Sequence, residues 1–158
     1  MFAAAVAAVF VLLLFLYESF VTATVILLMP VLAAGAVFVG LWLTRTELNI
    51  TAMMGMTMVI GIVTEVAIFF FSEFESLPAD MPLTERLSQA GRNRFRPIAM
   101  TTLAAMLTLL PLAFGLGQGA GMQQPLAIAI LSGLAVQLPL VLLVMPCLYR
   151  LASRGVRP

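Results

Sequence analysis

A single acidic residue, Glu65, stands well inside the apolar stretch formed by residues 50–71. If that stretch crosses a bilayer, a charge at such depth costs roughly 3 kcal/mol, so the carboxyl must find a partner or carry a proton. No basic residue lies within any apolar stretch of the chain, and we therefore expect Glu65 to be protonated at rest. A carboxyl that gains and loses a proton inside a membrane is what a proton relay requires. The alternative is a glutamic acid that only hydrogen-bonds to a neighbouring helix and holds the bundle together.

Threonine hydroxyls could serve as partners for that carboxyl. Thr101 and Thr102 lie near the start of the apolar stretch 97–116, and Thr64 directly precedes Glu65. We take Thr101 as the first candidate for the relay, with Thr102 and Thr64 in support. The alternative for each is a hydrogen bond to its own helix backbone, which is common for threonines in membrane helices.

Metal and cofactor chemistry find little support in the sequence. The chain has no histidine and one cysteine, Cys147, so the commonest metal ligand is missing and no internal disulfide can form. Methionines cluster early in the stretch 50–71, and thioethers bind Cu(I), but methionine is also ordinary filler in apolar helices. We predict no metal site, no cofactor and no enzymatic activity, with protons as the coupling ion.

The composition of the chain requires a lipid environment. Of its 158 residues 63% are hydrophobic and 9% are charged, whereas soluble domains are typically about 25% charged. A soluble fold of this size could not hide so much apolar surface. The chain also has no basic patch of the size that nucleic-acid binding needs. We therefore predict an all-α, polytopic membrane helix bundle.

Five apolar stretches are separated by polar connections. We expect them to cross the bilayer as helices, because barrel strands are only about 10 residues long and alternate in polarity. The expected spans are residues 1–16, 21–43, 50–71, 97–116 and 125–149, followed by a tail at 150–158. The first span reaches only roughly 24 Å against a hydrocarbon core of ~30 Å. This short beginning favours a chain that is a fragment of a longer transporter.

The longest connection, residues 72–96, carries most of the polar residues. Within it Leu83, Leu87 and Ala90 recur at helical spacing after Pro82, which predicts one short helix lying in the membrane interface. The alternative is a solvated loop.

The arginines predict the orientation of the chain. Seven of the eight lie in the connection 72–96 or in the tail, and only Arg45 falls on the other side. Under the positive-inside rule the connection and the C-terminus are cytoplasmic. We expect a multi-pass membrane protein with a cytoplasmic C-terminus.

Small and polar residues inside the spans predict helix contacts. Ala36 and Gly40 form a small-xxx-small face, and Gly55 and Gly61 give small surfaces on the helix that carries Glu65. Gln137, inside the last span, is interpreted as an interhelical hydrogen-bonding residue rather than a ligand.

Several runs of the sequence resemble one transporter family. Residues 17–20 and 30–35 look like the helix pair after the second large periplasmic domain of resistance-nodulation-division (RND) exporters. Residues 54–68 look like their tenth helix, and 115–119 resembles the glycine turn before the twelfth. The most specific run, RFRPIAMTT at 94–102, looks like the start of the eleventh helix. The chain thus resembles the last five helices of an AcrB/CusA-like RND efflux permease.

The resemblance implies a homotrimeric inner-membrane pump that exchanges protons for drugs, metals or lipids, completed by a periplasmic adaptor and an outer-membrane channel. The relay of such pumps couples aspartates on the fourth helix to a lysine on the tenth and a threonine on the eleventh. Thr101 stands where that threonine belongs, but Glu65 stands where multidrug members carry lysine. Metal-exporting members can carry an acid there, so export of drugs and of metal ions both stay open.

Two functions of different classes therefore remain. The chain is either the C-terminal membrane part of a proton-driven RND pump, joined to the rest of the permease, or a non-transporting scaffold or assembly subunit in which Glu65 is interhelical glue. A scaffold has no need for an acid at mid-membrane beside threonines, which favours the pump. A small stand-alone carrier is less favoured because the five spans show no inverted repeat.

Overall fold

The computed structural model describes residues 2–155, and Met1 and the last three residues of the expected tail (156–158) lie outside it. The elements follow in the order α1 (Phe2–Tyr17), α2 (Phe20–Leu43), α3 (Ile50–Ser76), α4 (Leu83–Ala113), α5 (Ala120–Pro139), the π-helical segment η1 (Leu140–Val144) and α6 (Met145–Gly155). No strand occurs among residues 2–155, which confirms the all-α bundle predicted from composition.

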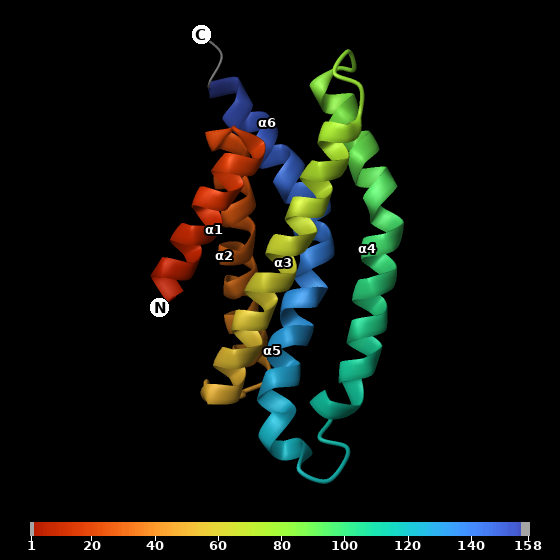
Figure 1. Cartoon of the computed structure of the whole chain (residues 1–158). Helices are drawn as coiled ribbons and strands as arrows, with labels where there is room; N and C mark the ends of the chain where they lie inside the picture. The colour runs from red at the N-terminus through yellow and green to blue at the C-terminus, as the bar shows by residue number, and fades with distance from the viewer. Residues whose placement is uncertain (1, 156–158) are drawn as a thin grey trace.

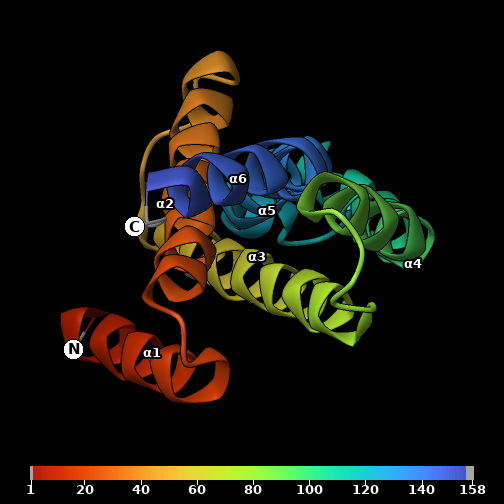
Figure 2. The ribbon, with the colours of Figure 1, turned by 90° about the horizontal axis from the view of Figure 1, so that it is seen from above.

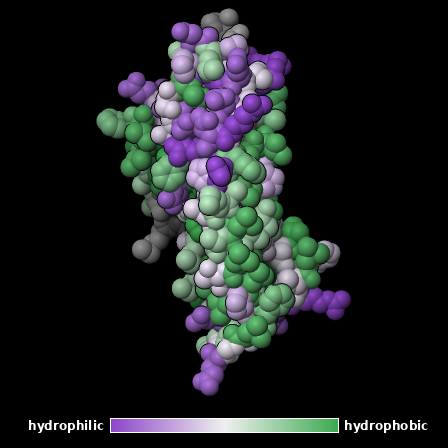
Figure 3. Space-filling view, turned by 90° about the vertical axis from the view of Figure 1, so that its right-hand side faces the viewer, coloured by the Kyte–Doolittle hydropathy of each residue, from purple (hydrophilic) through white to green (hydrophobic). Residues whose placement is uncertain are grey.

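The helices run alternately up and down (Figure 1). The α3–α4 connection and α6 lie at one end of the bundle, and the α2–α3 and α4–α5 connections lie at the other. We call the first the arginine-rich end, because α6 and the first part of α4 bring six arginines to it: Arg86, Arg92, Arg94, Arg96, Arg150 and Arg154. Figure 3 shows hydrophilic residues gathered at this end, beside a mostly hydrophobic band.

Within the described residues, four helices are long and apolar enough to cross a membrane. They are α2, α3, α4 and the continuous segment Ala120–Gly155, which joins α5, η1 and α6. The helix α1 is a shorter apolar helix of 16 residues. It lies at the edge of the bundle beside α2 (Figure 2) and is held there by Leu13, which is fully buried, and by the edge contact of Phe10 with Phe20.

The expected short interfacial helix is not a separate element. Residues 83–96 form the first half of α4, which continues without a break through Pro97 to Ala113. A proline inside a helix removes one backbone donor and commonly kinks or breaks the helix, but membrane helices tolerate it where neighbouring groups satisfy the freed carbonyl. The expected span 97–116 is therefore only part of a longer helix, and Pro82 precedes its first residue as the N-cap.

The helix α5 is the centre of the bundle, in contact with α2, α3 and α4 (Figure 2). Glycines allow these contacts: a Cβ on Gly40 would meet the Ser132 side chain, and one on Gly55 would lie 2.9 Å from the Ala129 Cβ. Gly133 of α5 meets the Val59 side chain in the same way, although it was not among the packing residues expected from the sequence. Such close approach without a Cβ is how membrane helices gain van der Waals contact.

Gly61 and Ala36, which were also expected to pack against a neighbouring helix, do not lie at such a contact in the structure. A Cβ on Gly61 would meet nothing within 4 Å, so this glycine makes no helix contact with the described chain. Ala36 is half-buried, whereas its neighbours Ala33 and Val37 are fully buried and carry the α2 contact. A small residue permits a neighbouring helix to approach closely, but it makes a contact only if a helix packs against the side of the helix on which the small residue lies.

An aromatic cluster fixes the arginine-rich end. Tyr17 donates its hydroxyl to the Ile68 carbonyl at 3.1 Å, and its ring meets Phe71, which in turn meets Tyr149 of α6. Arg86 of α4 lies 4.3 Å above the Phe74 ring and donates to the Phe74 carbonyl at 2.9 Å. The cluster thus joins α1, α3, α4 and α6, and the arginine satisfies a carbonyl in the last turn of α3.

The close approach of α5 to α3 predicts an asymmetry between two glycines. Gly133→Ala should lower the free energy of unfolding by about 1–3 kcal/mol, because its methyl overlaps the stiff, β-branched Val59. Gly61→Ala is the matched control and should be neutral or stabilising by up to about 1 kcal/mol, since alanine favours helix and the site is open. Unfolding of the purified chain in detergent, followed by circular dichroism, measures both. Equal effects would refute the packing described.

The arrangement of the two ends predicts how the chain sits in a membrane. In a Cys147→Ser background, cysteines at Ser88 and Ser153 should react with impermeant thiol reagents only from the cytoplasmic side, and one at Gln118 only from outside. Labelling of intact and opened cells distinguishes the sides. Swapped labelling would show that the orientation expected from the arginines is wrong.

Candidate functional site

A cavity of about 390 Å³ lies between α3, α4 and α5. Its α3 wall includes Ile62, Glu65 and Phe69, which share a face because they recur at intervals of three and four residues. The polar residues that line it are Glu65, Arg94, Thr101, Thr102 and Gln137. The cavity thus brings together the acid and both threonines expected to form a relay, and it adds an arginine and a glutamine.

Glu65 is exposed at this cavity. Its carboxylate makes no hydrogen bond or ion pair with any of the residues 2–155. Arg94 lines the same cavity, although no basic residue lies within the spans expected from the sequence. Glu65 is therefore open to a partner from outside the described chain.

The threonine hydroxyls divide into two kinds. Thr101 donates to the carbonyls of Pro97 and Ile98 at 3.0 Å each, and Thr64 donates to the Ile60 carbonyl at 2.7 Å. Both are thus bonded to their own helix, as the alternative reading of the sequence had it, and offer only lone pairs to a partner. Thr102 is 2% exposed and its hydroxyl has no partner among the described residues. Of the three, Thr102 has the hydroxyl that is free to donate.

Gln137 of α5 faces the same cavity. It is 1% exposed, and its carbonyl oxygen has no hydrogen-bond partner among the described residues. The interhelical hydrogen bond expected of it is therefore not formed among residues 2–155. Buried polar groups are nearly always hydrogen-bonded. Thr102 of α4 and Gln137 of α5 each bring an unpaired polar atom to this cavity, so the cavity can receive a polar group or a proton carrier.

Arg94 closes the cavity toward the arginine-rich end. Its guanidinium lies 3.2 Å from a carboxylate oxygen of Glu73, whose other oxygen accepts a hydrogen bond from Asn93 at 2.8 Å. The Arg94 Nε is buried and has no partner within the described chain. From the sequence, Arg94 was expected in the cytoplasmic connection 72–96, outside the spans. The signal that could have found it is its helical spacing from Ile98, Thr101 and Ala105 across Pro97.

The described residues contain no group of three or more histidine, cysteine or acidic side chains that could hold a metal ion. The polar groups of the cavity are one carboxylate, one guanidinium, two hydroxyls and an amide. This set is suited to passing protons and to binding polar groups by hydrogen bonds.

Comparison with known proteins gives two kinds of match. The model of the AcrB/AcrD/AcrF family matches residues 1–153. The chain is 42% identical over 149 residues to the multidrug resistance protein MdtC of Erwinia amylovora, and 40% identical over 149 residues to the protein of the same name from Erwinia tasmaniensis. Each match covers 92% of this chain and 14% of the relative, so the chain spans about one seventh of the length of these proteins.

The unpartnered carbonyl oxygen of Gln137 predicts an unusual response to substitution. Gln137→Leu should leave the free energy of unfolding unchanged or raise it, because it removes a buried acceptor that costs about 1–3 kcal/mol when unpaired. Gln124→Leu is the matched control, since Gln124 donates to the Ala113 carbonyl at 2.8 Å and its loss should cost about 1 kcal/mol. Unfolding of both variants in detergent tests this. A loss of more than about 1 kcal/mol at Gln137 would show that its amide has a partner in the folded chain.

Proposed function

Because this chain belongs to the AcrB/AcrD/AcrF family, we propose that it forms the C-terminal membrane part of a proton-driven efflux permease, in which the cavity between α3, α4 and α5 carries protons. The observation that supports the proposal is the convergence of Glu65, Arg94, Thr101, Thr102 and Gln137 on one cavity inside an apolar bundle. An ionisable group within a membrane helix is by default a functional-site candidate.

Glu65 is the proton carrier of this proposal. Loss of its proton leaves a carboxylate in the cavity that Arg94 lines, and this carboxylate competes with Glu73 for the guanidinium. Gain of the proton returns Arg94 to Glu73 alone. The two protonation states thus favour different contacts between α3 and α4, and a proton gradient can drive the exchange between them. Thr101, Thr102 and Gln137 hydrogen-bond to the carboxyl or to water along its path, and carboxyls from helices outside this chain complete the relay.

The substrates proposed for the complete permease are drugs, because the relatives of this chain are named multidrug resistance proteins. Metal ions are a second candidate, supported by the acid at Glu65. The permease is proposed to be a homotrimer in the bacterial inner membrane, with the arginine-rich end in the cytoplasm and with a periplasmic adaptor and an outer-membrane channel as partners. The chain needs no further cofactor in this proposal.

Neutralising Glu65 tests the relay. In a full-length permease that carries these helices, Glu65→Gln should leave insertion and assembly intact and abolish proton-coupled export, because the amide cannot exchange a proton. Glu65→Ala should do the same with some loss of packing. Drug export by cells, and proton uptake by vesicles across imposed pH gradients, measure the effect.

Glu18→Gln is the matched control, because Glu18 is exposed in the α1–α2 connection and does not line the cavity. It should export at the wild-type rate. If Glu65→Gln also exports at the wild-type rate across the range of gradients, Glu65 is structural and the scaffold hypothesis for this site gains support.

A further inference from the structure

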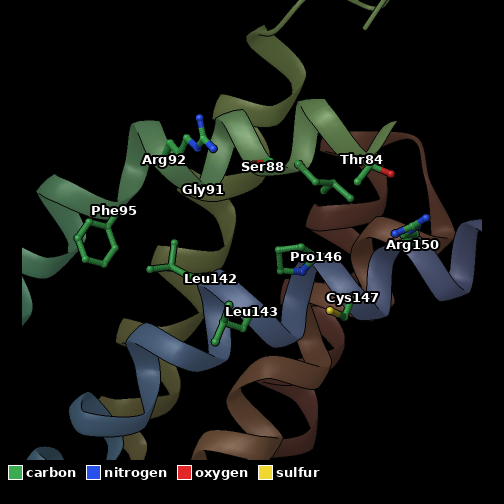
Figure 4. Close-up of a pocket in the computed structure, with 11 residues that line it drawn as sticks. Thr84, Ser88, Gly91, Arg92, Phe95, Leu142, Leu143, Pro146, Cys147 and Arg150 are labelled. Carbon is green, nitrogen blue, oxygen red and sulfur yellow. The ribbon is translucent and has the colours of Figure 1, made fainter. Parts of the chain in front are cut away.

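A second hollow, of about 420 Å³, lies between the first half of α4 and the segment formed by η1 and α6. We call it the α4–α6 groove. Figure 4 shows Phe95, Leu142 and Leu143 toward one end of it and Arg150 toward the other, with Arg92 above the apolar residues. The groove is separate from the cavity between α3, α4 and α5, with which it shares no lining residue.

The lining of this groove combines an apolar wall with two cations. Leu142, Leu143 and Phe95 supply apolar surface, whereas Arg92 and Arg150 supply positive charge, and no acidic residue lines the groove. This is the composition of a site for an amphiphile whose head carries negative charge. A soluble anion would leave the apolar wall unused, and an uncharged apolar ligand would leave two arginines without a counter-charge.

The two arginines of the groove differ from their neighbours on α4. Arg86 is bonded to the carbonyls of Phe74 and Leu77, and Arg94 is paired with Glu73. Arg92 and Arg150 are exposed and make no ion pair with an acidic residue of the described chain. Their charges are therefore available to a ligand at no cost to the fold.

The position of the groove fits a lipid. It lies at the arginine-rich end, where the apolar part of the bundle meets the polar cap in Figure 3. Basic pockets between membrane helices on the cytoplasmic side commonly hold the head groups of anionic lipids. We infer that the α4–α6 groove binds an anionic phospholipid, with Arg92 and Arg150 as the cations that attract its head group and an acyl chain along Phe95, Leu142 and Leu143. This inference does not depend on proton transport.

Native mass spectrometry of the purified chain tests lipid selectivity. The chain is released from nanodiscs of equal parts dioleoyl phosphatidylglycerol and dioleoyl phosphatidylcholine, which share their acyl chains and differ in head-group charge. We expect retained lipid to be mainly phosphatidylglycerol. In the double variant Arg92→Gln/Arg150→Gln this preference should fall by roughly 25-fold, because each arginine near an anionic head group contributes about fivefold.

The matched control is Arg45→Gln/Arg154→Gln, which removes two exposed arginines outside the groove and should keep the preference. Circular dichroism establishes that both variants are folded. Equal retention of the two lipids by the unaltered chain would overturn the inference, and so would a preference that survives in the groove variant.

The reactivity of Cys147, the only cysteine in the sequence, reports whether lipid occupies the groove without any change to the arginines. Cys147 is exposed and lines the groove, so a bound lipid should slow its alkylation by N-ethylmaleimide several-fold in phosphatidylglycerol relative to phosphatidylcholine nanodiscs. The control chain carries Cys147→Ser and Ser153→Cys, whose thiol is on the same helix but outside the groove, and should show no such difference.

Three alkylation results would overturn the inference. Unchanged reactivity of Cys147 would place the lipid elsewhere. Equal slowing at both positions would be a general effect of the charged surface. Protection by millimolar inorganic phosphate in phosphatidylcholine nanodiscs, to the extent given by phosphatidylglycerol, would show a site for soluble anions rather than for a lipid.

Discussion

The close approach of α5 to α2 and α3 is the constraint on which the rest of the bundle depends. Lipid is as apolar as the helix surfaces, so burying leucine or valine there gains little, and contact between backbones must hold the helices together. Gly40, Gly55 and Gly133 provide that contact, and each does so against α5 or from it. The positions of these glycines therefore determine where the helices meet at the centre of the bundle.

The cavity between α3, α4 and α5 is a consequence of how α4 joins this centre. At the arginine-rich end α4 is tied to α3 by the contacts of Asn93 and Arg94 with Glu73. Beyond that point much of its surface is exposed, as at Met100, Leu103 and Leu107. A helix fixed to α3 at one end and to α5 along its length leaves a space where three helices meet, and Glu65, Thr102 and Gln137 point polar groups at that space.

Composition and the length of the apolar stretches were sufficient to predict the helical bundle. In lipid every backbone N–H and C=O group must be hydrogen-bonded within the protein, and an apolar stretch of about 20 residues achieves this as a helix. Composition was also sufficient to single out Glu65, since an acid in an apolar run is conspicuous in any sequence. It could not predict the role of Arg94, which depends on α4 staying helical through Pro97. Nor could it distinguish Gly61 from Gly133, because a glycine shows where helices can meet and only the fold shows where they do. Nor could it predict that the Thr102 hydroxyl is buried without a partner, because this depends on which face of α4 turns toward α5, and the sequence periodicity does not determine that.

The continuity of α4 has a mechanical consequence. Its 31 residues extend over about 46 Å as one hydrogen-bonded segment. Residues 84–95 supply its wall of the α4–α6 groove, and residues 94–105 supply its wall of the cavity between α3, α4 and α5, so the two stretches meet at Arg94. In a continuous helix of this length a tilt at one end would displace the other, and the Arg94–Glu73 contact lies between the two ends. In the proposed relay, the thickness and charge of the surrounding bilayer would act on the same helix whose contacts a proton changes.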